Sequence, residues 1–128
     1  MRLRLFLAAL TRNRARTSPE ADDPRLRSLV VPAPRPAVWR AVVALAEAEP
    51  GWTVVAADEA AGELRAEART PRLGFTDDVV VRVTDAGGAT RVDLESASRV
   101  GRADLGTNAR RIARFLHGVR SRFARDPG

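Results

Sequence analysis

Two runs of alternating apolar and polar residues around a tight turn constrain the fold of this chain most. Residues 76–84 and 90–98 are rich in β-branched side chains, and the DAGG between them is typical of a β-hairpin turn. A turn there places apolar side chains opposite each other on one face: Val83 with Val92, and Val81 with Leu94. On the other face the same register predicts a surface ion pair between Arg82 and Asp93.

A second hairpin is predicted upstream of the first. Its EAAGELRAEAR segment holds good helix formers, yet its charged and apolar residues alternate with the period of a strand. A turn at residues 58–62 brings apolar side chains together on one face: Val54 with Ala66, and Trp52 with Ala68. This agreement of register with burial favours two strands over 52–57 and 63–69, with Ala56 on the same face as Val54.

The flanking segments complete a two-layer α+β domain. A strand is predicted over residues 26–31, and a helix over 38–49 that ends before Pro50. A last helix over 104–123 carries one continuous apolar stripe: Leu105, Ala109, Ile112, Leu116, Val119 and Phe123. The element order β-α-β-β-β-β-α predicts a mainly antiparallel sheet of about five strands with two helices packed on one face.

The charged residues are unevenly distributed along the 128 residues, of which 22 are Lys or Arg and 16 are Asp or Glu. Residues 1–16 hold five arginines and no acid, whereas residues 25–103 are neutral. We expect a basic N-terminal arm and polar linker over 1–24, then a single domain over 25–125. Nucleic acid is not expected as a partner, because the neutral body has no basic stripe interleaved with aromatic residues.

Residues that the chain lacks exclude several kinds of chemistry. There is no cysteine and no lysine. This composition excludes disulfides, zinc–thiolate sites, iron–sulfur clusters, lysine Schiff bases and the lysine of a phosphate-binding P-loop. No cofactor is expected.

The first ten residues, MRLRLFLAAL, combine arginines with a short apolar run over residues 5–10. This run is shorter than the core of a signal peptide and far too short to span a bilayer, so we expect a cytoplasmic protein. A basic amphipathic start can also rest on an anionic membrane surface. The alternative function is therefore that of an accessory protein peripheral to the inner face of the membrane.

Several segments from Gly51 onward carry a resemblance to a known family. They read GW, GELRAEA, GFTDDVVVRV and RVDLESASRVGRADLGTNARRIARFL. The chain resembles the family catalogued as domain of unknown function 1499, whose members share the GW start, a GF-x-DDV-x-x-RV strand and an SRVGR-x-DLG-x-NA-x-RI segment. The resemblance spans roughly residues 25–117 and implies the fold boundaries without implying an activity. Glu95 departs from the pattern, which has a basic residue there, and this argues against anion contact on that strand face.

Polar residues gather at the junction between the last strand and the last helix: Ser96, Ser98, Arg99, Arg102, Asp104 and Asn108. A helix N terminus offers free N–H groups and a partial positive charge. Arg99 and Arg102 would add two full charges, so we expect a site for a phosphate or carboxylate here. Asp104 would orient the loop and Asn108 would add a hydrogen bond.

A purely structural role for these residues stays open. In that interpretation Asp104 caps the last helix, while Arg99 or Arg102 pairs with Asp77 or Asp78. Asp77 and Asp78 are secondary site candidates, but neighbouring strand residues point to opposite faces. No metal site is therefore expected.

No catalytic constellation stands out in the sequence. His117 is the only histidine, and no serine or aspartate lies at a recognised spacing from it. We therefore predict a non-enzymatic binding domain for a small anionic ligand or a protein partner. A hydrolase that uses Asp77, Asp78 and Asp104 is the other alternative, and it requires these carboxylates to converge in one pocket.

Overall fold

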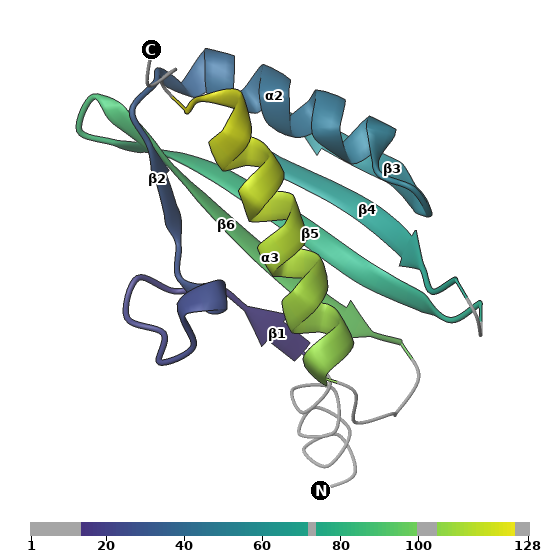
Figure 1. The fold of residues 1–128 in the computed structure, drawn as a ribbon. Coiled ribbons are helices and arrows are strands. Elements are labelled where there is room, and N and C mark those ends of the chain that lie inside the picture. Colours follow the sequence, from purple (N-terminus) through teal and green to yellow (C-terminus); the bar gives the residue numbers. More distant parts are fainter. Residues whose placement is uncertain (1–13, 72–73, 100–104, 125–128) are drawn as a thin grey trace, which may run out of the picture.

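The computed structural model describes residues 14–71, 74–99 and 105–124. In chain order these residues form the following elements (Figure 1): β1 Arg14–Arg16, the 3-10 helix η1 Pro24–Leu26, β2 Leu29–Val31, α2 Arg35–Ala48, β3 Trp52–Asp58, β4 Glu63–Arg69, β5 Thr76–Ala86, β6 Ala89–Ser98 and α3 Leu105–Arg122.

The strands of the described part form one antiparallel sheet in the order β1-β6-β5-β4-β3, and β2 also pairs with β6. Both helices lie on the same face of this sheet, with α3 crossing it (Figure 1). The predicted two-layer α+β class is therefore confirmed. The sheet has six strands in this part of the chain, because β1 and β2 pair with two successive stretches of β6.

The sequence pattern does not predict β1. Its three residues alternate, so that Ala15 is buried while Arg14 and Arg16 are exposed. After β1, Thr17 continues onto β6: its amide donates to the carbonyl of Leu94, and the amide of Leu94 donates to Thr17 Oγ1 at 3.0 Å. The N-terminal part of the described chain is thereby attached to the sheet.

The register of both predicted hairpins is confirmed. Val83 pairs with Val92 and Val81 with Leu94 in the β5–β6 hairpin, and all four side chains are buried. In the β3–β4 hairpin the predicted pairs also form: Trp52 with Ala68, and Val54 with Ala66.

A β-bulge in β3 makes the expectation for Ala56 wrong. The register shifts between Val54 and Ala56, so Ala56 pairs with Arg65 and is exposed. Val55 is also exposed, at 55%. A bulge inserts one residue into one strand and reverses the faces beyond it, which simple alternation cannot reveal.

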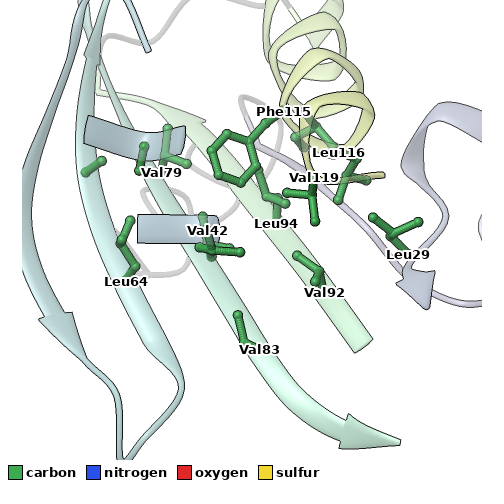
Figure 2. Close-up of a cluster of buried hydrophobic side chains, with 14 of the residues drawn as sticks. Leu29, Val42, Leu64, Val79, Val83, Val92, Leu94, Phe115, Leu116 and Val119 are labelled. Atoms are coloured by element: carbon green, nitrogen blue, oxygen red, sulfur yellow. The ribbon is translucent and has the colours of Figure 1, made fainter. Parts of the chain in front are cut away.

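The core lies between the sheet and the two helices. Phe115, Leu116 and Val119 of α3 point toward Val92 and Leu94 on β6 (Figure 2). From α2, the fully buried residues Val38, Val42 and Ala46 complete the layer, and Trp39 is buried as well. Most of the buried strand residues are valine or alanine, which fit a thin, close-packed interface between a sheet and helices.

Arg35 links α2 to the β3–β4 turn. Its Nη2 donates to the carbonyl of Glu59 at 2.7 Å, and its Nε donates to the carbonyl of Val83 at 3.3 Å. Gly62 lies beneath this guanidinium with φ +68°, and its carbonyl accepts from the amide of Val83. The close approach of three segments here leaves room only for glycine.

Asp93 does not form the predicted ion pair with Arg82, although the two residues are directly opposite. Its carboxylate accepts from Thr17 Oγ1 at 2.7 Å, from Ser28 Oγ and from Arg91 Nε at 2.6 Å. Arg82 instead lies 3.5 Å from both Glu63 and Glu95. The prediction is wrong because Ser28, Arg91 and Thr17, which lies in the N-terminal segment that the pattern did not predict, occupy the Asp93 carboxylate.

Candidate functional site

A buried polar cluster lies at the junction between β6 and α3. The inward alternation of β5 and β6 places Asp77, Ser96 and Ser98 on the helix side, where each is at most 2% exposed. The first turns of α3 bring Asn108 and Arg111 onto them. The sequence therefore builds this cluster by continuing the strand pattern of the core into polar residues.

Hydrogen bonds join these five side chains, which we call the junction network. Arg111 Nη1 lies 2.8 Å from Asp77 Oδ2, and it also donates to Ser96 Oγ at 3.1 Å and Asn108 Oδ1 at 3.0 Å. Ser96 Oγ donates to Asn108 Oδ1 at 2.7 Å, and Asn108 Nδ2 donates to Ser98 Oγ at 3.2 Å. The network connects β5, β6 and α3.

Burial gives the Asp77–Arg111 pair a structural role. The Asp77 side chain is 0% exposed and that of Arg111 is 12% exposed. Burying a carboxylate costs free energy unless it is paired and hydrogen-bonded, so separating Asp77 from the other members of the junction network would destabilise the fold. Asn108 lies within this network and holds the start of α3 against β6.

Arg99 lies on the opposite face of the sheet from Asn108. Its guanidinium contacts Asp78, at 2.8 Å from Nη2 to Oδ1, and Glu67, at 2.6 Å from Nη2 to Oε2. The hydrogen bonds that Arg99 donates to Asp78 and, to a smaller extent, to Glu67 raise the pKa of Arg99 above its ordinary value. The structure thus shows the Arg99–Asp78 pair of the structural interpretation. Arg102 and Asp104 lie outside the described residues.

Asp77 and Asp78, the two described carboxylates of the hydrolase alternative, do not converge. Asp77 faces the helices, whereas Asp78 faces away from them and pairs with Arg99. Among the residues with described positions, no group of three histidine or acidic side chains could hold a metal ion. His117 is exposed on α3, and its backbone carbonyl accepts a hydrogen bond from Ser121 Oγ. These residues lack the geometry that the hydrolase alternative needs.

The uncovered face of the sheet is hollowed over β4, β5 and β6, with a volume of about 630 Å³. Four arginines line this open-face hollow, namely Arg14, Arg65, Arg82 and Arg99. Each of them forms an ion pair with an acid of the same face, and Glu95 receives both Arg14 and Arg82. The hollow is therefore close to charge balance.

Sequence reasoning missed Arg111 and Phe115. Arg111 is one of several arginines beside the apolar stripe of the last helix, where exposed side chains are expected. Its inward position can be inferred only once Asp77 is known to be buried. Phe115 stacks on Trp52, with ring centroids 5.0 Å apart and planes 9° from parallel. The sequence did indicate the strand part of this network. Continuing the Val81–Leu94 pairing by two residues at a time along the buried face gives the pairs Val79–Ser96 and Asp77–Ser98.

The segment 7–119 matches the family model described as a protein of unknown function, DUF1499. No protein with a curated description matches the chain. Across the described residues, no helix is long and apolar enough to cross a membrane.

Two solved structures are similar to this chain at low sequence identity. One is the crystal structure of Ara h 8.0201, with a TM-score of 0.50, 16% identity, and coverage of 74% of this chain and 95% of that chain. Another is TTHA0849 from Thermus thermophilus, with a TM-score of 0.42, 14% identity, and coverage of 86% of this chain and 96% of that chain. At such identities the likeness to Ara h 8.0201 concerns the fold alone.

Proposed function

The chain belongs to the DUF1499 family of proteins of unknown function, and we propose that it is a non-enzymatic binding domain. Its ligand is a small anion, bound at the strand-to-helix junction over residues 99–108. Arg99 and Arg102 supply positive charge and Asp104 orients the loop. Asn108 keeps the first turns of α3 in place through the junction network.

The position of Arg99 carries this proposal. Arg99 directly follows β6 and precedes the segment that leads into α3, and its guanidinium lies on the uncovered face of the sheet beside Glu67 and Asp78. Its partners Glu67 and Asp78 are themselves 41% and 51% exposed. Exposed ion pairs contribute little to stability, so a ligand anion can replace one of them at small cost.

Calorimetric titration of the full chain tests this function. The probes are inorganic phosphate, nucleotides and small organic acids, and the variants are Arg99→Gln, Arg102→Gln and the control Arg40→Gln, an exposed arginine of α2. We expect one class of anion to bind the wild type and the control equally, and to bind the two junction variants about tenfold more weakly. Absence of binding by every probe would overturn the proposal.

The membrane-peripheral alternative rests on residues 1–10, which lie outside the described part of the chain. Its supporting features are the two arginines and the short apolar run within residues 1–10. Co-sedimentation with vesicles of anionic lipid, with and without residues 1–10, separates it from the binding domain. If the truncation leaves sedimentation unchanged, this alternative is wrong.

A further inference from the structure

A cleft of about 440 Å³ lies where the first turns of α3 pass the start of β3 and the end of β4. This volume is within the range of small-molecule sites. Thr107 and three arginines line it from α3, and Trp52, Arg69 and Pro71 line it from the sheet side. Arg99 does not line this cleft, so the cleft is separate from the junction site proposed above.

The charge of the cleft is not balanced. Among the residues that the structure describes, the ionisable lining consists of Arg69, Arg110, Arg111, Arg114 and one acid, Glu49. Arg111 is committed to Asp77, and Arg114 Nε lies 2.6 Å from Glu49 Oε1. Arg69 and Arg110 form no ion pair with any acid that the structure describes. In the open-face hollow, by contrast, every lining arginine has an acidic partner.

The backbone of the β4–β5 turn supports Arg69. Gly74 has φ +67°, and a Cβ atom there would lie 3.2 Å from Arg69 Nη2 and 3.4 Å from Nε. The guanidinium therefore lies directly over the glycine backbone. Thr70 organises this turn: its carbonyl accepts from the amide of Gly74 at 3.0 Å, and its Oγ1 accepts from the amide of Phe75 at 2.9 Å. The Arg69 guanidinium therefore packs against an ordered turn at the edge of the cleft.

The rest of the cleft is apolar. Trp52 is held in place by its stacking on the buried ring of Phe115, with ring centroids 5.0 Å apart. Pro50, Ala68 and Pro71 lie beside it in the lining. An aromatic wall next to two uncompensated guanidinium groups favours a ligand with a flat apolar body and a negative head, because arginine binds carboxylates with a planar pair of donors.

We propose that this cleft binds a small aromatic monocarboxylate, with its carboxylate between Arg69 and Arg110 and its ring against Trp52. The inference does not depend on Arg99 and assigns the protein a second ligand class. A dicarboxylate or an inorganic phosphate fits less well, because neither would contact the apolar wall.

The test uses the full chain and three matched probes in calorimetric titrations: 2-naphthoate, the neutral 2-naphthylmethanol and acetate. We expect 2-naphthoate to bind at least tenfold more tightly than either control, since only it has both the ring and the charge. Tryptophan fluorescence should change on binding, because Trp52 lines the cleft whereas Trp39 is buried elsewhere in the core.

Four variants then locate the site. Arg69→Gln and Arg110→Gln should each weaken 2-naphthoate binding about tenfold, because each removes one charge-assisted hydrogen bond. Arg40→Gln and Arg99→Gln should bind as the wild type does, and thermal melts verify that all four variants fold.

The outcomes separate this inference from the proposed function. The proposed carboxylate site would be wrong if 2-naphthoate and 2-naphthylmethanol bound equally well. It would also be wrong if both Arg69→Gln and Arg110→Gln kept wild-type affinity for 2-naphthoate. Loss of 2-naphthoate binding in Arg99→Gln alone would overturn the cleft and support the junction site. If 2-naphthoate fails to bind while phosphate binding depends on Arg99, the cleft is wrong and the proposed function stands.

Discussion

At the scale of single residues, Gly62 has the least room for a side chain among the described glycines. A Cβ atom there would lie 2.3 Å from the carbonyl oxygen of Val83 and 2.6 Å from Arg35 Nη2. Gly62→Ala should therefore lower the free energy of unfolding by about 2–4 kcal/mol, combining a left-handed φ with a clash against backbone. Urea denaturation measures the loss.

Gly87→Ala is the matched control for this prediction. Gly87 has a similar φ of +60°, but nothing lies within 4 Å of a Cβ atom built there. Its loss should be about 1 kcal/mol, the cost of the left-handed backbone alone. Equal losses in the free energy of unfolding at the two positions would show that the clash with Val83 and Arg35 does not contribute to the effect of Gly62→Ala.

Asp93 makes the stability depend on pH. Burial pushes the pKa of this carboxyl up, but hydrogen bonds from Ser28, Thr17 and Arg91 outweigh burial and hold the pKa below its ordinary value of 3.8. A depressed folded-state pKa stabilises the protein above the unfolded-state pKa, and this contribution disappears as the pH falls through the folded-state value.

Asp93→Asn tests this dependence. The difference in free energy of unfolding between wild type and variant should be constant from pH 7 to about pH 5 and shrink below about pH 4. Urea titrations at a series of pH values measure it. A difference that stays constant down to about pH 2.5 would contradict the assignment.

At the scale of elements, the junction network holds α3 to β5 and β6. Arg111→Met should lower the free energy of unfolding by about 3–5 kcal/mol, because it leaves the Asp77 carboxylate buried without its cation. Arg120→Met, an exposed position on the same helix, is the control and should change it by less than about 0.5 kcal/mol. A small effect of Arg111→Met would mean that α3 is held by its apolar stripe alone.

The contact between α2 and α3 has room for one more methyl group. Gly118 lies in the middle of α3, and a Cβ atom there would lie 3.5 Å from Leu45 Cδ2, an ordinary van der Waals separation. Gly118→Ala should therefore raise the free energy of unfolding by about 0.5–1 kcal/mol, through higher helix propensity. A higher melting temperature for Gly118→Ala than for the wild type would confirm this. A lower melting temperature would mean that the packing against Leu45 is too tight for the added methyl group.

Elements with a regular pattern could be predicted from the sequence, and irregular ones could not. The hairpins follow from alternation, and the helices follow from apolar residues at a spacing of three or four. The bulge at Val55 could not be predicted, because it is a single inserted residue. The strand β1 could not be predicted either, because Ala15 is its only apolar residue. The residue content of Arg14–Arg16 is as typical of a solvated arm as of an edge strand.

For the molecule as a whole, the candidate site was predicted only in part. The sequence places polar residues at the β6–α3 junction, and the structure describes Arg99 and Asn108 on opposite faces there. The Arg99–Asp78 pair was among the predicted alternatives, but the pairing of Asp77 with Arg111 could not be predicted, because it depends on which residue of α3 turns inward. The cleft escaped as well, since Arg69 and Arg110 lie 41 residues apart in the chain and meet only after folding.

The pairing of β1 with β6 has a consequence for synthesis of the protein. Thr17 and its partner Asp93 are 76 residues apart in the chain. At about 5–20 residues per second, a ribosome needs roughly 4–15 s to make that stretch. The nascent chain must therefore wait with its first strand unpaired until β6 has left the exit tunnel, and a chaperone that binds short arginine-rich segments would have that interval in which to act.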